Sequence, residues 1–208
     1  MTPGPTLIMK APGCVRPVKF ASIASGNNFG ATYWTDGKEE APMLPDEPWL
    51  RVSPAEKVMF WSDECEEIGQ IGYFSRGSDN QEWDDLEYAE EPSEDDYFSA
   101  LQSGIAVTPE KERYIRMRLW WRASDPIRQG KSSHFSDPHR DNLQHFESIL
   151  SEEDDNQRLM KAEALRQLSR FEDALRLLNG DFPEEYAHAV NLIRDLAAQG
   201  NTYVAKLT

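Results

Sequence analysis

Two cysteines are the candidate nucleophiles of this chain of 208 residues, and they stand at positions 14 and 65. A catalytic thiol works as a thiolate, so its surroundings must lower its pKa. Cys65 instead lies in the acidic run Asp63–Glu67, whose four carboxylates should raise that pKa. Cys14 lies in a turn rich in glycine and proline. Neither thiol is therefore expected to act as a nucleophile, although one disulfide is possible.

Three histidines, His134, His139 and His145, are close enough in sequence to suggest a metal site at a loop-to-helix transition. Their spacing matches no known ligand motif such as His-Glu-x-x-His, so surface histidines are the preferred interpretation. The sequence also contains no phosphate-binding loop, no dinucleotide fingerprint and no nucleophile elbow. Acidic pairs such as Asp84-Asp85 are more typical of solvated charge than of a general acid and base. We therefore expect no cofactor and no metal, and an enzyme is the less favoured alternative.

The net charge of −15 is concentrated in one part of the chain. Residues 62–96, which we call the acidic stretch, carry 14 acidic side chains and one basic side chain. Such a field repels phosphate, so direct binding of nucleic acid is not expected. It attracts basic surfaces and accelerates their encounter. A protein with a basic surface is therefore the expected partner.

Aromatic residues are interleaved with these charges, which is unusual for a disordered acidic tail. Trp83 stands between Glu82 and Asp84, and Tyr88 follows Glu87. Aromatic side chains supply much of the energy of protein interfaces, whereas charge supplies fast but salt-sensitive association. The predicted binding site comprises Asp79, Glu82, Trp83, Asp84, Asp85, Glu87, Tyr88, Glu90 and Glu91. A rival hypothesis is that these carboxylates only neutralise Arg113, Arg116 and Arg118 within the same molecule.

Composition divides the chain into three parts: a β-rich part at 1–61, an acidic connector at 62–92 and a helical domain at 93–208. The first part is rich in glycine and proline, and Asp36-Gly37 is a typical hairpin turn. Candidate strands are Val15–Ile23, Phe29–Trp34 and Val58–Trp61. The predicted fold class is α+β, with the small β-rich part packed on the helical array.

Helix signals dominate from Ser93 onward. Ser93 is a good N-cap, and Gly104 can end the short helix that it opens. A proline follows the N-cap in Thr108-Pro109, and this helix should stop near Ala123, before Asp125-Pro126. Asp137-Pro138 opens another helix. Apolar stripes predict three more helices, around Leu159–Leu165, over Phe171–Leu178 and after Pro183.

The N-terminal part resembles uncharacterised bacterial proteins that carry a zinc-ribbon-like segment. The resemblance rests on the segments Ser25–Ala31, Trp34–Lys38, Ala41–Pro45 and Phe60-Trp61. In that pattern two Cys-x-x-Cys knuckles flank the segment, and the corresponding positions here are Ala11 and Cys14, then Ser53 and Glu56. One thiol and one carboxylate cannot form a four-coordinate structural zinc site. The resemblance thus implies a ribbon without its metal.

Residues 158–181 resemble a tetratricopeptide-type helical hairpin. The family's small and large packing positions are occupied by Ala162, Leu165, Ser169, Phe171, Ala174 and Leu178. A single unit of this kind must bury its faces against flanking helices. The resemblance implies a scaffold that binds proteins, and an ordinary helical hairpin remains the alternative.

The sequence therefore favours a protein-binding protein without catalytic activity. The most concrete form is an acidic inhibitor or immunity-type protein that covers a basic partner such as a nuclease toxin. The alternative is a general adaptor that binds through the helical groove. No apolar run is long enough for a membrane span, and we expect no membrane partner. The absence of a signal peptide pattern and the scarcity of cysteine favour a cytoplasmic location.

Overall fold

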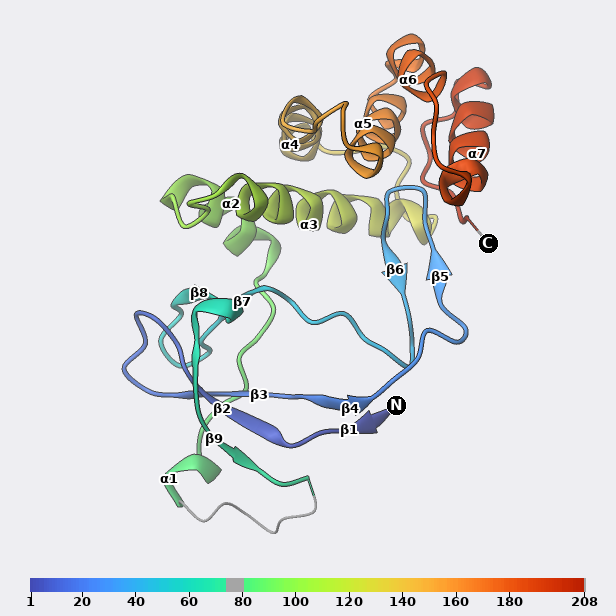
Figure 1. The fold of residues 1–208 in the computed structure, drawn as a ribbon. Helices are drawn as coiled ribbons and strands as arrows, with labels where there is room; N and C mark the ends of the chain where they lie inside the picture. The colour runs from blue at the N-terminus through green and yellow to red at the C-terminus, as the bar shows by residue number, and fades with distance from the viewer. Residues whose placement is uncertain (74–80, 208) are drawn as a thin grey trace. The chain divides into compact units, whose positions relative to one another are not determined.

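The computed structural model describes residues 1–73 and 81–207 and shows an α+β protein, which confirms the predicted fold class (Figure 1). The chain forms two compact units. The sheet unit comprises residues 1–31 and 40–105, and the helical unit comprises residues 32–39 and 106–208. The division differs from the one that composition suggests, because the acidic stretch belongs to the sheet unit and a hairpin from the N-terminal part belongs to the helical unit.

Small antiparallel sheets build the sheet unit. One has the strand order β3-β2-β9, with β2 at its centre. Strands β7 and β8 form a separate hairpin, and β1 pairs with β4. The bounds are β1 Thr2–Pro3, β2 Thr6–Lys10, β3 Val18–Phe20, β4 Ile23–Ser25, β7 Leu50–Val52, β8 Met59–Trp61 and β9 Glu66–Ile71.

The core of the sheet unit lies between these strands. Met9, Val18, Phe20 and Phe60 are buried together. The rings of Phe20 and Phe60 stack with their centroids 6.3 Å apart. Both Cys14 and Cys65 are half-buried against the same cluster and are free thiols. Apolar side chains from hairpins that are distant in sequence thus hold the unit together.

The acidic stretch contributes one more extended segment to the sheet unit. Lys19 of β3 donates its backbone N–H to Glu87 and accepts a hydrogen bond from Ala89, each 2.9 Å long. Val52 of β7 and Glu90 exchange two backbone hydrogen bonds of 2.9 and 3.0 Å. Residues 87–90 therefore bridge the sheet of β3 to the hairpin of β7.

Helix α2, Glu94–Ser103, follows this segment and begins as predicted. The Ser93 side chain accepts a hydrogen bond from the Asp96 backbone, while the Asp96 carboxylate accepts one from the Ser93 backbone. This reciprocal capping box satisfies two N–H groups that the first turn would leave unpaired. Gly104 ends the helix with φ of 77°, a left-handed conformation that glycine adopts without strain.

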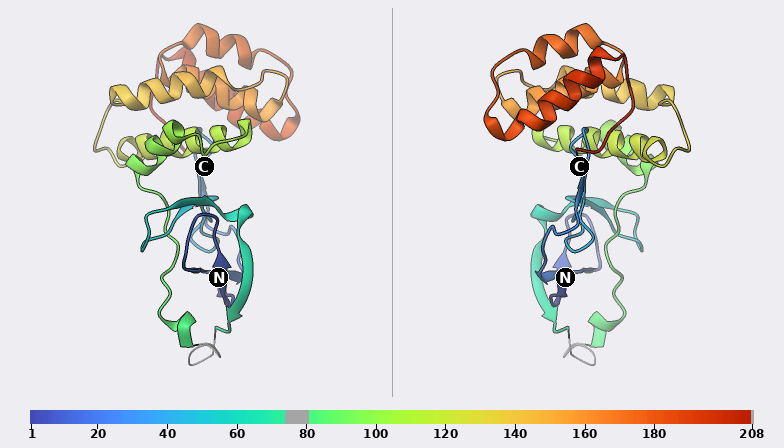
Figure 2. Two further views of the ribbon diagram at one scale, coloured as in Figure 1. Left: turned by 90° about the vertical axis from the view of Figure 1, so that its left-hand side faces the viewer. Right: turned by 90° about the vertical axis from the view of Figure 1, so that its right-hand side faces the viewer.

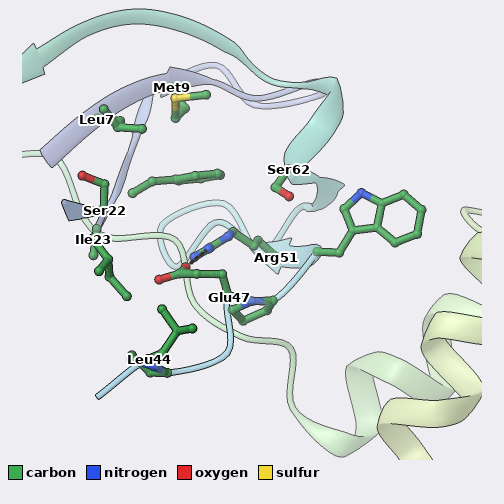
Figure 3. Close-up of a pocket in the computed structure, with 13 residues that line it drawn as sticks. Leu7, Met9, Ser22, Ile23, Leu44, Glu47, Arg51 and Ser62 are labelled. Carbon is green, nitrogen blue, oxygen red and sulfur yellow. Dashed lines mark hydrogen bonds and ion pairs between the residues drawn. The ribbon is translucent and has the colours of Figure 1, made fainter. Parts of the chain in front are cut away.

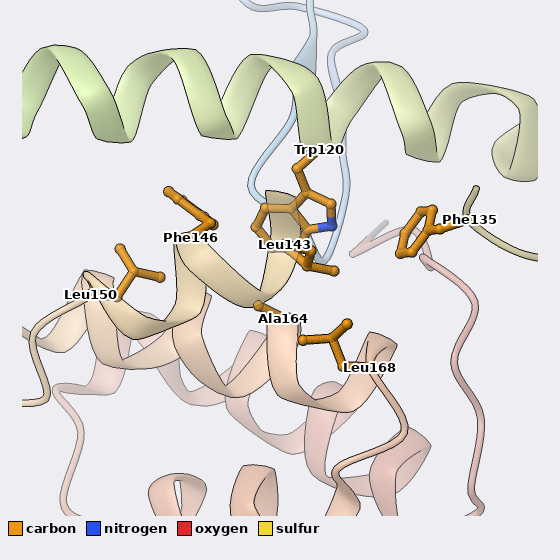
Figure 4. Packing of buried hydrophobic residues seen from close by; sticks show 7 residues of the cluster. All are labelled: Trp120, Phe135, Leu143, Phe146, Leu150, Ala164 and Leu168. Carbon is orange, nitrogen blue, oxygen red and sulfur yellow. The ribbon is translucent and has the colours of Figure 1, made fainter. Parts of the chain in front are cut away.

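The helical unit contains five α-helices among the residues described, and neighbours in sequence are neighbours in space (Figure 2). Their packing buries two clusters. The first includes Trp120, whose indole ring has its centroid 5.6 Å from that of the Phe146 ring (Figure 4). Leu165, Leu178 and Ile193 are fully buried in the second. The bounds are α3 Pro109–Arg128, α4 Asp137–Ser148, α5 Asp155–Gln167, α6 Phe171–Leu178 and α7 Ala187–Ala198.

Helix α3 begins at Pro109 as predicted, but its expected end near Ala123 is wrong. The helix runs through Pro126 to Arg128. Proline removes one hydrogen bond of the helix, and ion pairs stabilise the turn that follows it. Asp125 accepts hydrogen bonds from Arg128 and Lys38, and Arg128 also pairs with Asp36. These tertiary contacts outweigh the local preference to stop.

The partners Asp36 and Lys38 belong to a hairpin that is part of the helical unit (Figure 1). Its strands are β5 Thr32–Tyr33 and β6 Glu39–Glu40. The expected turn at Asp36-Gly37 is present, with φ of 78° at Gly37. Asp36 is completely buried, which raises the pKa of its carboxyl, while Arg128 acts in the opposite direction. The hairpin thus places a buried ion pair at the end of α3.

A second buried polar network ties the same hairpin to α5. Glu163 accepts hydrogen bonds from the Thr35 hydroxyl at 2.7 Å and from Gln167 at 2.7 Å. Arg166 donates to both carboxylate oxygens of Glu163, at 2.6 and 2.7 Å. Arg166 also donates to the carbonyls of Asn201 and Tyr203 near the C-terminus. Glu163 and Arg166 are both completely buried.

Within residues 1–73 and 81–207, no helix is long and apolar enough to cross a membrane.

Candidate functional site

Six carboxylates of the predicted site are exposed in the structure, and we call this surface the acidic face. It begins at the short helix α1, Gln81–Asp84, and continues along the bridging residues 87–90. Asp79, the remaining acidic residue of the predicted site, lies outside the described residues. The members of the acidic face are Glu82, Asp84, Asp85, Glu87, Glu90 and Glu91.

The backbone under the acidic face is fixed by contacts on both sides. The Lys19 ammonium group donates a hydrogen bond of 2.9 Å to the carbonyl of Asp84. The bridge from Glu87 to Glu90 fixes the next residues through the backbone hydrogen bonds described above. A charged surface held in one conformation loses less entropy on binding than a flexible one. The acidic face is therefore presented as an ordered surface.

The two aromatic residues of the predicted site have different environments. Trp83 is half-buried, and its ring covers Gly69 of β9 so closely that a Cβ atom at Gly69 would overlap it. Tyr88 is 50% exposed, and its hydroxyl lies 3.0 Å from the hydroxyl of Thr6. Tyr88 can therefore contact a partner directly, whereas Trp83 also stabilises the sheet unit.

A cavity of about 340 Å³ lies beside Trp83. Glu82 and Asp85 of the acidic face contribute to its wall, opposite the turn that carries Val15 and Arg16. Val15 is 90% exposed, which places an apolar side chain at the edge of the charged surface. This combination of a concave apolar site and flanking carboxylates suits an aromatic or long aliphatic side chain next to a cation.

The rival hypothesis of internal neutralisation named three arginines of α3. Arg113 pairs with Glu110 at 3.0 Å and Arg116 pairs with Glu112 at 2.8 Å, so both have acidic partners within their own helix. The guanidinium group of Arg118 lies over the rings of Tyr114 and Trp121. Arg113 and Arg116 thus have carboxylate partners outside the acidic stretch.

The cysteines lie in surroundings that favour the protonated thiol. Burial raises the pKa of Cys65 to about 11, and Asp63 and Glu64 add to this shift. The sequence correctly predicted that the pKa of Cys65 is raised, although burial raises it more than the carboxylates do. Burial also raises the pKa of Cys14, with the Glu56 carboxylate adding to the effect.

The structure brings together all four positions that correspond to zinc ligands in the zinc-ribbon-like pattern. The Cys14 backbone N–H donates a hydrogen bond of 3.2 Å to the carbonyl of Ala11. Cys14 interacts with both Ser53 and Glu56. The Glu56 carboxylate accepts hydrogen bonds from the backbone of Val15, at 2.9 and 3.1 Å, and of Arg16, at 2.9 Å. Two turns are thereby joined by a carboxylate. These hydrogen bonds lower the pKa of Glu56.

The three clustered histidines have separate environments. His139 contacts the hydroxyl of Ser136 at 2.7 Å, and His145 contacts the carbonyl of Asp141 at 2.8 Å. In the described part of the chain, no group of three or more histidine, cysteine, aspartate or glutamate side chains could hold a metal ion.

Two further cavities lie away from the acidic face, one in each unit. One of about 360 Å³ lies between α3, α4 and α5, with Met117, Phe146 and Met160 in its wall. The other, of about 600 Å³, lies in the sheet unit and contains Arg51 (Figure 3). Pro45 and Pro48 line the larger cavity.

Comparison with known proteins adds no family to this description, since no protein-family model, no curated protein and no solved structure matches the chain.

Proposed function

We propose that this protein binds a basic protein through the acidic face, as an inhibitor or immunity-type protein does. The observation that supports the proposal most directly is the exposure of six carboxylates on a backbone segment fixed by hydrogen bonds. A partner such as a nuclease toxin has a basic surface where phosphate binds, and carboxylates can occupy that surface. Tyr88 and the cavity beside Trp83 supply apolar contact within the same region.

Charge and aromatic contact should contribute differently to binding. Carboxylates raise the association rate, and this effect weakens as salt screens the charges. Buried aromatic contact mainly lowers the dissociation rate. The acidic face should therefore give an association rate that falls steeply with ionic strength.

The test begins with co-purification from the native cell using three forms of the protein. The first is the unmodified protein, and the second carries Asp84→Asn, Asp85→Asn and Glu87→Gln. The third removes three exposed carboxylates of the helical unit instead, through Asp181→Asn, Glu184→Gln and Glu185→Gln. A basic protein retained by the first and third forms, and lost by the second, is the expected result. Equal retention by all three forms would contradict the proposal.

Association and dissociation rates measured with the captured partner then separate the contribution of charge from that of aromatic contact. The acidic-face variant should associate more slowly, with a weaker dependence on salt, whereas Tyr88→Ala should dissociate faster. Stability is measured on the same variants by urea denaturation. If the acidic-face variant loses stability but binds unchanged once folded, the carboxylates act within the molecule.

A second candidate function is an adaptor that binds through the helical unit. The cavity between α3, α4 and α5 has an apolar base of Met117, Phe146, Leu150 and Met160. Methionine-rich surfaces adapt to different apolar partners. Met160→Arg should abolish partner binding if this cavity is the binding site and leave it intact if the acidic face is.

A further inference from the structure

The largest cavity described for the sheet unit has the composition of a small-molecule site (Figure 3). Its volume of about 600 Å³ lies within the range of roughly 300–1,000 Å³ that is typical of ligand pockets. Most of its wall is apolar, and it includes the aromatic rings of Phe20 and Trp49. Two charged residues interrupt this wall, Arg51 and Glu47.

Arg51 is buried to an unusual degree for a cation. Its side chain is only 9% exposed, and its guanidinium group lies 4.3 Å from the centroid of the Phe20 ring. Its Nε atom has no hydrogen-bond partner among the described residues. A buried donor without an acceptor is costly, so an acceptor supplied by a ligand would be bound favourably.

Glu47 forms an ion pair with Arg51, but its side chain is much more exposed than that of Arg51. The Glu47 side chain is 48% exposed and accepts a hydrogen bond from Nη2 of Arg51. Figure 3 shows Arg51 meeting Glu47 inside the cavity, with Leu7 and Met9 on one side and Leu44 on the other. Glu47 can therefore move into solvent without breaking the core, and a second carboxylate could take its place.

We propose that this cavity binds an aromatic monocarboxylate, with its carboxylate on Arg51 and its apolar body against Phe20 and Trp49. A planar guanidinium group has five N–H donors and binds a carboxylate through two parallel hydrogen bonds. A ligand with one negative charge is favoured over a ligand with two, because the protein has a net charge of −15 and repels anions at long range. Glu47 competes with the ligand for Arg51.

The experiment follows the side-chain Nε–H signal of Arg51 by nitrogen-15 NMR while 4-phenylbutyrate is added. The Arg51→Lys variant assigns the signal, because it removes that nitrogen and keeps the charge. A matched titration uses 4-phenylbutanol, which has the same apolar body without the charge. We expect 4-phenylbutyrate to shift the Arg51 signal and to bind about tenfold more tightly than the alcohol, which is typical of a charge-assisted hydrogen bond.

Two substitutions complete the test. Glu47→Gln removes the competing charge and should tighten binding of 4-phenylbutyrate severalfold, while Arg51→Met should abolish it. Arg140→Met, at an exposed arginine of α4, is the matched control and should bind like the unmodified protein. If Arg51→Met does not fold, the Glu47→Gln and Arg51→Lys results decide.

Three results would overturn the proposal. These are an Arg51 signal that does not move at millimolar 4-phenylbutyrate, equal affinity for the acid and the alcohol, and unchanged or weaker binding by Glu47→Gln. None of these outcomes depends on the acidic face.

Discussion

The buried pair of Glu163 and Arg166 allows the sharpest prediction of stability. Glu163→Gln keeps the size of the side chain and removes its charge. Arg166 would then be a fully buried cation whose nearest carboxylate has been lost. Its other acceptors, the carbonyls of Asn201 and Tyr203, carry no net charge to balance it.

The expected loss is about 3–5 kcal/mol, the usual effect of removing one partner from a buried ion pair. This is a large share of the total stability of a domain, which is on the order of 5–15 kcal/mol. The two carboxylate oxygens of Glu163 now accept hydrogen bonds from Thr35, Arg166 and Gln167. A glutamine at this position would offer only one carbonyl oxygen as an acceptor. Part of the network must therefore lose its acceptor.

Urea denaturation followed by far-ultraviolet circular dichroism measures the loss. Glu172→Gln is the control, because Glu172 is an exposed carboxylate on α6. Hydrogen exchange gives a local measurement: the backbone N–H of Thr35 bonds to Ala205 at 2.9 Å, and it should exchange faster in Glu163→Gln. The double variant Glu163→Gln, Arg166→Met should lose less stability than the sum of the losses in the two single variants, because it leaves no unpaired buried cation.

A loss below about 1 kcal/mol in Glu163→Gln would show that the buried pair does not need its negative charge. Strict additivity of the losses in the double variant would show that Glu163 and Arg166 do not stabilise each other.

Four further predictions concern other parts of the molecule. Glu56→Gln should destabilise the sheet unit at neutral pH. The pKa of Glu56 in the folded protein lies below its ordinary value of 4.5. Above pH 4.5 the variant should therefore have a lower free energy of unfolding than the unmodified protein, measured by urea denaturation. This difference should vanish as the pH falls through the folded pKa, because Glu56 is then protonated. Cys65 has a pKa of about 11 against an ordinary 9.0, so its thiolate fraction at neutral pH is about 100-fold lower, while the more basic thiolate is more nucleophilic. It should therefore react with iodoacetamide about tenfold more slowly than a free thiol, and equal rates would contradict its burial. Gly69→Ala should cost about 1–3 kcal/mol by displacing Trp83, and an unchanged unfolding midpoint would show that the ring can move freely. Leu178→Asp buries an unpaired charge and should cost several kcal/mol, whereas Arg176→Asp on the exposed side of α6 should not.

The helices were predictable because their signals are local. The capping box at Ser93, the proline after Thr108 and the apolar stripe of α7 each lie within a few residues of the structure that they specify. The end of α3 was not predictable in this way, since Asp36 and Lys38 stabilise it from about ninety residues away.

The strands were harder to predict than the helices, because they depend on contacts with residues distant in sequence. Strand β9 was missed because Glu66 and Glu67 suggest solvated charge, yet its place at the edge of a sheet lets those side chains face water. The bridge at residues 87–90 depends on partners in β3 and β7 that no local pattern identifies.

The candidate site was predictable in part. The exposure of the six carboxylates follows from their number, because so many like charges cannot be buried without partners. The second role of Trp83, as the cover of Gly69, depends on a contact across the sheet unit. The burial of Arg51 depends on Phe20, whose ring lies against its guanidinium group, and the cavity also needs Leu7 and Met9 of β2, so residues near Arg51 in sequence do not indicate the cavity.

The hairpin of residues 32–39 gives the chain an unusual order of assembly. Its Thr35 hydroxyl accepts a hydrogen bond from Ala205, a residue 170 positions later. During synthesis from the N-terminus, the hairpin leaves the ribosome long before α5 or the C-terminal residues exist. The helical unit can therefore close only after residue 205 has been synthesised, and chains that end before residue 201 would lack the carbonyl partners of Arg166. Residues 201–205 thus decide whether a hairpin made about 170 residues earlier can join the helical unit.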